Sequence, residues 1–377
     1  MVQEKHIDFI DLKSQQQLIG PALMKRIEQV LAHGKFIMGP EIKELEERLA
    51  QYVGVKHAIT CSSGTDALLM PLLAYGIGPG DAIFTTPFTF IATAEVIQLL
   101  GATPVFVDID PRTFNLDPEA LEHTIDNLDK YLRTANLRPR GIIPVDLFGQ
   151  PADYDRINAL ARQHGMFVLE DAAQSFGATY KGKRAGSLSD AAATSFFPAK
   201  PLGGYGDGGA IFTNDEALAA DLRSIRVHGQ GNHKYNNVRI GINGRLDTLQ
   251  AAIILEKLAI FDFEVGLRQK VAQRYHQGLS HKVEIPYVIP DATSVWAQYS
   301  VLSENRAEMQ QKLQKAKIPT AVYYPMPLHL QGAFRHLRYR KGDFPQSEKA
   351  SQYIFSLPMH PYLQEADQER IISVMLS

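Results

Sequence analysis

One stretch decides how this chain is read: Thr194-Ser195-Phe196-Phe197-Pro198-Ala199-Lys200-Pro201-Leu202-Gly203-Gly204-Tyr205-Gly206-Asp207-Gly208-Gly209-Ala210. A short apolar run ends there in a turn that carries Lys200 between two prolines. Because proline has a fixed φ and no amide hydrogen, the lysine is held in a stiff, non-helical turn. The glycines that follow allow a close approach of backbone or ligand. Taken alone, Lys200 is more simply a solvated lysine than an amine that forms a Schiff base with an aldehyde cofactor.

Length, charge and cysteine usage exclude several classes of protein. The chain has 377 residues, more than the ~250–300 at which a single core stops growing, so we expect two domains. A net charge of -2 gives no general reason to bind nucleic acid or an anionic membrane. The single cysteine, Cys61, excludes an intrachain disulfide and a cysteine-cluster metal site. Neither a signal peptide nor a membrane-spanning run is present, so we expect a cytoplasmic protein.

From Ala58 onward, short β-rich runs alternate with helical segments. The expected strands are 58–60, 82–85, 105–107, 142–145, 167–169 and 192–197. Such alternation, with strands apolar on both faces, predicts an α/β domain with a mostly parallel sheet between helices. In open sheets of this kind a ligand binds at the carboxyl ends of the strands. The turns that follow the strands are therefore where chemistry is expected.

The segments that flank this region are read from periodicity and turn residues. Residues 7–10 are expected to form a short strand, and a helix follows. The apolar residues that share one face of that helix are Leu23, Ile27, Val30 and Leu31. The four basic residues of the connection 127–140 form a solvated surface more simply than a binding patch.

The domain boundary is placed within a long helix. This helix begins near Arg245 and is expected to break near Phe261-Asp262-Phe263. We assign residues 1–255 to a large domain and residues 256–377 to a smaller α+β domain.

Three turns after expected strands carry candidate binding groups. The turn Cys61–Leu68 contains hydroxyls and the start of a helix, which suit a phosphate but equally suit simple capping by Ser63 or Thr65. In the next turn, Phe88 could lie flat on a heteroaromatic ring, or could simply belong to the core.

The third turn places a carboxylate directly after an apolar strand. Burying Asp171 there without a partner would be costly, and a protonated pyridine nitrogen would remove that cost. Gln174 would face the same side and could reach a ring hydroxyl. Capping of the next helix by Asp171 explains the residue equally well.

Together these turns favour a pyridoxal phosphate site. A phosphate turn, an aromatic, a buried aspartate and Lys200 all follow strands of one sheet, and Ser195 adds a hydroxyl for the phosphate. The glycine run 203–209 lacks the Gly-Lys-Ser/Thr of a nucleotide-binding loop. Neither a metal-binding spacing nor a Gly-x-Ser-x-Gly elbow is present, so no metal is expected.

The chain resembles the DegT-type sugar aminotransferases over nearly its whole length. The motifs that carry the resemblance are Glu170-Asp171-Ala172-Ala173-Gln174-Ser175-Phe176-Gly177, Ser195-Phe196-Phe197-Pro198-Ala199-Lys200, Gly206-Asp207-Gly208-Gly209 and Asn243-Gly244-Arg245-Leu246-Asp247. The resemblance implies an aspartate aminotransferase-like (fold type I) architecture with pyridoxal 5'-phosphate (PLP) as the cofactor. The cofactor would alternate with its pyridoxamine form.

The resemblance also implies roles at the cofactor. Lys200 would form the Schiff base and shuttle the proton, and Asp171 would pair with the pyridine nitrogen. Gln174 would contact the ring oxygen, and Phe88 would stack on the ring.

The phosphate would be held by Gly64, Thr65 and Ser195 of the same subunit. By resemblance, Asn243 would reach the phosphate of the neighbouring subunit, so a homodimer with shared active sites is expected.

On the substrate side, Arg245 is the best candidate for a carboxylate, because guanidinium binds carboxylate in two-pronged fashion. By resemblance, Tyr323, Tyr324 and His329 complete this side. Tyr323-Tyr324-Pro325 stands where similar enzymes often have His-Tyr-Pro. The longer connection 127–140 is a second departure, and the two leave the sugar open.

The resemblance is strongest to the branch that aminates C3 of UDP-2-acetamido-2-deoxy-3-oxo-glucuronate for bacterial surface polysaccharide. L-glutamate would donate the amine and leave as 2-oxoglutarate. Two alternatives are an aminotransferase for another sugar, such as a 4-keto-6-deoxy nucleotide sugar, and a non-catalytic PLP-binding regulatory protein.

Overall fold

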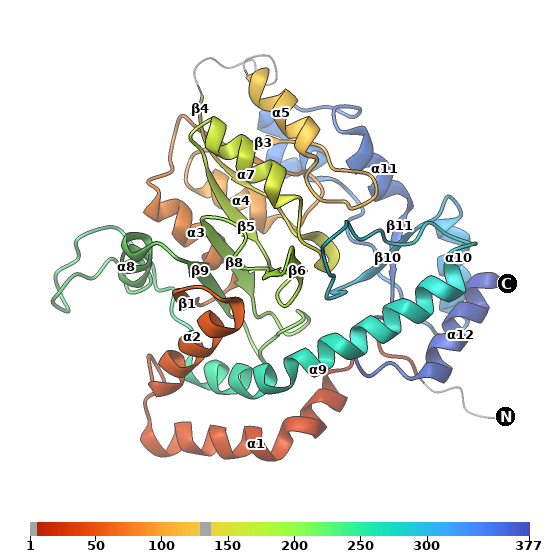
Figure 1. Cartoon of the computed structure of the whole chain (residues 1–377), viewed down its shortest axis with the longest axis horizontal. Coiled ribbons are helices and arrows are strands. Elements are labelled where there is room, and N and C mark those ends of the chain that lie inside the picture. Colours follow the sequence, from red (N-terminus) through yellow and green to blue (C-terminus); the bar gives the residue numbers. More distant parts are fainter. Residues whose placement is uncertain (1–5, 129–136) are drawn as a thin grey trace.

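The computed structural model describes residues 6–128 and 137–377. A central sheet with helices on both faces is joined by the long helix α9 to a smaller group of C-terminal elements (Figure 1). No helix among these residues combines the length and the apolar character needed to cross a membrane.

The element bounds follow the sequence closely. The strands are β1 His57–Cys61, β2 Asp81–Thr85, β3 Thr103–Phe106, β4 Arg138–Ile143, β5 Phe167–Asp171, β6 Thr179–Tyr180, β7 Lys183–Arg184, β8 Ala191–Ser195, β9 Gly209–Thr213, β10 Tyr299–Leu302 and β11 Ile354–Leu357. The α-helices are α1 Leu12–His33, α2 Pro40–Val53, α3 Gly64–Ala74, α4 Ala92–Leu99, α5 Pro118–Asp126, α7 Tyr154–Gln163, α8 Glu216–Ile225, α9 Thr248–Leu279, α10 Arg306–Lys315, α11 Pro345–Tyr353 and α12 Glu365–Leu376. Short 3-10 turns are η1 Leu147–Gly149, η2 Leu328–Leu330 and η3 Gly332–Leu337.

The central sheet has seven strands in the order β1-β9-β8-β5-β4-β2-β3. Strand β9 is antiparallel to both of its neighbours, and the other pairs are parallel. The expectation of a mostly parallel sheet between helices is therefore confirmed. The carboxyl ends of β2, β5 and β8 share one edge, which brings their following turns together.

Both faces of the sheet are covered. Helices α3, α4 and α8 pack on one face, where Ile83 and Leu169 point, and α5 and α7 pack on the other, where Phe84 and Val168 point. Successive residues of a strand face opposite sides, so a sheet buried on both sides needs apolar residues at consecutive positions. This explains why these strands read as continuous apolar runs.

Three local expectations are wrong. Residues 7–10 form no strand, and Leu31 is exposed although the rest of its expected face packs inward or is half-buried. Helix α9 continues through Phe261, which packs against α2 and the sheet, while the side chain of Asp262 accepts a hydrogen bond from the Tyr52 hydroxyl. Phe261 is buried and Phe263 is exposed, so the two aromatic residues lie on opposite sides of a continuous helix.

Helix α9 also crosses the expected domain boundary. Its first part packs in the core with α2, and its last turns pack with β10, β11 and α12. The division into 1–255 and 256–377 stays a prediction. Strand β4 begins at Arg138, earlier than expected, and Arg138 and Arg140 pair with buried Asp81. Residues 129–136 of the connection 127–140 lie outside the described residues.

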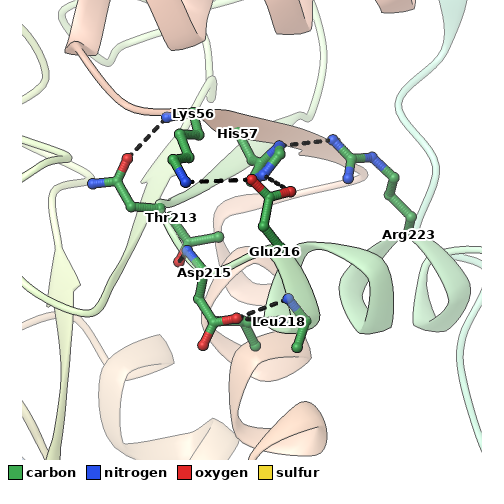
Figure 2. A network of polar contacts seen from close by, with 9 residues as sticks. Lys56, His57, Thr213, Asp215, Glu216, Leu218 and Arg223 are labelled. Atoms are coloured by element: carbon green, nitrogen blue, oxygen red, sulfur yellow. Dashed lines mark hydrogen bonds and ion pairs between the residues drawn. The ribbon is translucent and has the colours of Figure 1, made fainter.

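Polar contacts join strand β1, at the edge of the sheet, to helix α8. Figure 2 shows Glu216 between Lys56 and His57, with Arg223 on the other side of the imidazole. The His57 Nε2 to Glu216 Oε2 distance is 2.7 Å. Lys56 and Glu216 are largely exposed at the protein surface, so the contribution of these ion pairs to stability is small.

A buried arginine makes a second and stronger connection to β1. The Arg226 guanidinium pairs with Glu46 and donates to the Thr60 carbonyl at 2.9 Å, while the Arg226 carbonyl accepts from Gly244 N at 3.0 Å. The Arg226 and Glu46 side chains are 5% and 15% exposed. Arg226 thus ties α2, β1 and the segment at Gly244 together.

We expect Arg226→Met to lower the free energy of unfolding by about 3 kcal/mol, because Glu46 then keeps a largely buried charge without its ion-pair partner and with hydrogen bonds from Thr60 alone. The matched control is Arg239→Met, which breaks the more exposed pair with Asp221 and should cost under about 1 kcal/mol. Denaturant unfolding of the two variants measures both values. Equal losses of unfolding free energy in the two variants would contradict the expectation that burial makes the Arg226–Glu46 pair more important for stability.

Candidate active site

Lys200 and Asp171 come together at the edge where β8 and β5 end. Lys200 lies in the turn after β8, and its amide donates to the Phe197 carbonyl at 2.8 Å. Withdrawal of the Lys200 amine from water lowers its pKa, and the negative charge of Asp171 acts in the opposite direction. Asp171 is thus the charged group that acts on the lysine, while the expected roles of both residues at a cofactor stay predictions.

The Asp171 carboxyl is only 5% exposed and is held by two hydrogen bonds. The Thr93 hydroxyl donates to Oδ2 at 2.8 Å, and the Ala173 amide donates to Oδ1 at 3.2 Å. Burial raises the pKa of Asp171, and the hydrogen bonds and Lys200 oppose this effect. A cation placed against this carboxyl would favour its ionised form further.

The expected phosphate turn lies beside the end of β8. A Cβ on Gly64 would fall 2.6 Å from the Cβ of Ser195, so only glycine leaves room there. Ser63 caps α3, because its hydroxyl accepts from the Asp66 amide at 3.0 Å. The capping role is therefore taken by Ser63, and helix α3 begins with Gly64 and Thr65 next to Ser195.

Phe88 and Gln174 meet at Tyr324. The Phe88 ring is fully buried and lies 6.1 Å from the Tyr324 ring, edge to face. Gln174 Nε2 donates to the Tyr324 hydroxyl at 3.3 Å, and its Oε1 accepts from the Phe148 amide at 2.7 Å. The expected roles of Phe88 on the ring, Gln174 at the ring oxygen and Tyr324 at the substrate stay predictions, and the contact of Gln174 with the Phe148 amide was not predicted from the sequence.

The segment with Asn243 and Arg245 runs beside the phosphate turn. The Gly244 carbonyl accepts from the Ser62 amide at 3.1 Å. Asn243 is exposed, whereas Arg245 is half-buried and its Nε has no hydrogen-bond partner among the described residues. Both side chains thus have polar atoms left for a ligand or another subunit.

His329 is placed differently from the other substrate-side candidates. Its side chain is fully buried, packs against the Phe344 ring and contacts Glu348 through Nε2 at 3.1 Å. Tyr323 is half-buried and lies against Tyr324 with 5.9 Å between ring centroids. The roles of His329 and Tyr323 in substrate binding stay predictions.

Comparison with known proteins identifies the family of the chain. The profile of the DegT/DnrJ/EryC1/StrS aminotransferase family covers residues 17–376. The chain belongs to this family. A Pseudomonas aeruginosa protein, UDP-2-acetamido-2-deoxy-3-oxo-D-glucuronate aminotransferase, is 52% identical over 370 residues, which are 98% of this chain and 99% of that protein.

Two solved structures are also similar. A DegT/DnrJ/EryC1/StrS aminotransferase from Brucella abortus has 50% identity and a TM-score of 0.95, with 98% of this chain and 99% of that chain covered. A Bacillus subtilis structure with bound pyridoxamine phosphate has 30% identity and a TM-score of 0.88, with 100% and 86% covered. The protein is therefore a PLP-dependent sugar aminotransferase with the type I fold.

The residues present fit this cofactor. The absence of a side chain at Gly64 lets Ser195 approach the start of α3 closely, and a hydroxyl beside a helix N-terminus suits a phosphate. The buried Asp171 carboxyl suits a protonated ring nitrogen, and the amine of Lys200 lies beside it. In the part of the chain that the structure describes, no group of three or more metal-ligating side chains is assembled.

We expect Gly64→Ala to weaken PLP binding at least tenfold, because the added methyl group would collide with Ser195 and displace the phosphate turn. Gly266→Ala is the control, since a Cβ there meets nothing within 4 Å and the residue lies inside α9. Equilibrium titration with PLP, followed by absorbance, measures the affinity of both variants. Wild-type affinity in Gly64→Ala would contradict the assigned phosphate site.

Proposed function

We propose that this protein aminates C3 of UDP-2-acetamido-2-deoxy-3-oxo-glucuronate, with L-glutamate as the amino donor, for a bacterial surface polysaccharide such as an O-antigen. The observation that carries the proposal is the 52% identity, over essentially both full lengths, to a protein of that activity. The half-buried and unpartnered Arg245 Nε supports it, since a uronate adds a carboxylate to the sugar.

Different residues of the chain have different roles in this reaction. PLP, when bound, supplies the electron sink of the reaction. Lys200 moves the proton at the substrate carbon, which its lowered pKa favours because a neutral amine is needed to accept a proton. Asp171 keeps a proton on the ring nitrogen through its negative charge. Thr93 and the Ala173 amide hold that carboxyl in place.

Residues on the substrate side of the cofactor would select the sugar. Arg245 would bind the uronate carboxylate, while Tyr323 and Tyr324 line the approach beside Phe88. Gln174 would reach the ring oxygen, and its bond to the Tyr324 hydroxyl couples the two sides.

The proposal is tested by incubating the pyridoxamine form with a panel of UDP- and dTDP-linked ketosugars and following the return of the aldehyde form. We expect the UDP-3-oxo-uronate to react fastest, and Arg245→Ala to lower kcat/KM on it by about 10- to 100-fold, as for loss of a charged hydrogen bond. Arg156→Ala, at the surface beside Glu119, is the control and should keep the wild-type rate.

A 4-keto-6-deoxy sugar as the best substrate, with no effect of Arg245→Ala, would instead support the second sugar class, which Tyr323 in place of the frequent histidine leaves open. Lys200→Ala should bind PLP and have no turnover. A wild type whose bound cofactor does not change its absorbance with glutamate would support a non-catalytic protein or another donor.

We also propose that two chains form a dimer with shared sites. Exposed apolar side chains lie on α1, on the loop before α2 and on the segment after α8: Leu18, Met24, Leu31, Phe36, Ile37, Met38, Tyr235, Val238 and Ile240. Apolar patches of this kind mark interaction surfaces. Ile37 is paired with Asp247, so part of this surface is continuous with the segment of Asn243 and Arg245.

Mixed dimers test the sharing of sites. If Asn243 serves the partner subunit, a heterodimer of one Lys200→Ala chain and one Asn243→Ala chain contains one intact site, so we expect about half of the wild-type activity. If Asn243 serves its own subunit, both sites carry a defect and mixing restores nothing. Sedimentation of the wild type checks the dimer itself.

A further inference from the structure

Two further carboxyl groups lie directly behind Asp171. Glu170 precedes it in β5, so its side chain points to the opposite face of the sheet. Asp146 follows β4, and its amide donates to the Asp171 carbonyl at 3.1 Å. Both Asp146 and Glu170 are completely buried. Neither takes part in the chemistry proposed above.

The Asp146 carboxyl is surrounded by donors. Oδ1 accepts from the Ala152 amide and from the Tyr154 hydroxyl, each at 2.9 Å, and Oδ2 accepts from the Ser175 hydroxyl at 2.7 Å. Three donors are what an ionised carboxylate requires in a buried place. Asp146 is therefore built to carry a negative charge.

The Glu170 carboxyl has fewer donors and also contacts Asp146. Its oxygens accept from the Gly186 amide at 2.6 Å and the Leu188 amide at 3.1 Å, and the charge of Asp146 acts on it. In the part of the chain that the structure describes, neither carboxyl has an ion-pair partner. Two ionised carboxylates accept hydrogen bonds only and repel each other, so a buried pair without a cation favours a proton on one of them.

We propose that Asp146 and Glu170 share one proton at neutral pH, carried by Glu170 and donated to Asp146, and that this pair positions Asp171. Burial raises the pKa of both groups, and the hydrogen bonds from Ser175, Ala152 and Tyr154 oppose this effect at Asp146, so the proton is placed on Glu170. The pair then holds one negative charge behind Asp171 and not two.

The pair acts on the site through the backbone. Asp146 fixes the Asp171 carbonyl by its amide, and the Asp171 amide donates to the Pro144 carbonyl at 3.0 Å. Through Ser175 it also fixes the turn that carries Gln174. Asp146 and Glu170 are thus positioning residues, and their relevance to the cofactor rests on the proposed function.

The other titratable groups around the pair are few. Tyr154 from α7 donates to Asp146, and burial keeps the pKa of its hydroxyl well above the ordinary value. The Asp171 side chain points to the other face of the sheet but adds a further negative charge that acts on Asp146, and the charge of Lys200 acts on Asp171. A second charge on the pair would oppose ionisation of Asp171 itself.

Infrared spectroscopy of the cofactor-free protein tests the shared proton directly. At pH 7 we expect a carbonyl band of a protonated carboxyl group that shifts in D2O and is absent from Glu170→Gln. The band should disappear from the wild type as the pH is raised. A wild type without such a band at pH 7 would overturn the proposal, whether or not the variant folds.

The pH dependence of unfolding gives the second measurement. Folding raises the pKa of Glu170, so between about pH 5 and the pKa in the folded protein the native state keeps a proton that the unfolded chain releases, and stability falls as the pH rises. Glu170→Gln lacks this proton. The unfolding constant of the wild type should therefore rise relative to that of the variant by up to tenfold per pH unit.

Asp81→Asn is the matched control, since Asp81 is equally buried but paired with Arg138 and Arg140. The ratio of the unfolding constants of the wild type and Asp81→Asn should stay constant as the pH rises over the same range. A constant ratio between wild type and Glu170→Gln would contradict the shared proton. Neither measurement uses cofactor or substrate, so a failed transamination assay leaves this proposal untouched, and a failed proton test leaves the proposed function untouched.

Discussion

The active site depends on the attraction between two buried opposite charges, Lys200 and Asp171. Burial alone pushes the pKa of the lysine down and that of the aspartate up, toward neutral forms that pair less well. Each group opposes the change in the other, so the pKa of each moves less than burial alone would move it. An amine that must bind an aldehyde and also transfer a proton is favoured by a pKa below the ordinary value of lysine. The fold maintains it by placing the two residues at the ends of adjacent parallel strands.

Much of the remaining structure limits how far this pair can move. Thr93 from α4 holds the aspartate from one side of the sheet, and Asp146 holds its backbone from the other. The lysine turn is enclosed between prolines, and the glycines after it pack against Gln250 of α9. Because these contacts come from separate elements, no single loop controls the position of the reacting groups.

The sequence predicted the parts of this arrangement that follow from strand order. Phe88, Asp171 and Lys200 each come directly after a strand, and parallel strands bring such turns to one edge. Thr93 could not be predicted, because a helix residue 78 positions before Asp171 shows its role only when α4 packs on the sheet. The same holds for Asp146: a carboxylate after a strand is visible in the sequence, but its contact with Glu170 depends on the register between β4 and β5.

The wrong predictions for α1 and α9, outside the strand region, have a different cause. The aromatic residues at 261 and 263 suggested a break in α9, yet one is buried and the other exposed, so each suits its own side of a continuous helix. Leu31 shares the period of its helix but faces outward. Periodicity detects an apolar face without showing which molecule covers it, and a face that a second subunit would cover looks the same as core.

The chemistry and the selectivity of the site rest on different kinds of structure. The groups around Asp171 are buried and fixed by hydrogen bonds within one chain, so they suit a reaction step common to the whole family. Asn243 is exposed and Arg245 keeps an unpartnered nitrogen, on a segment continuous with the exposed apolar surface. We therefore expect a change of sugar to require changes mainly in this outer part, because the carboxyl groups of Asp146, Glu170 and Asp171 are buried within one chain. Conservation of chemistry together with divergence of substrate follows from this separation.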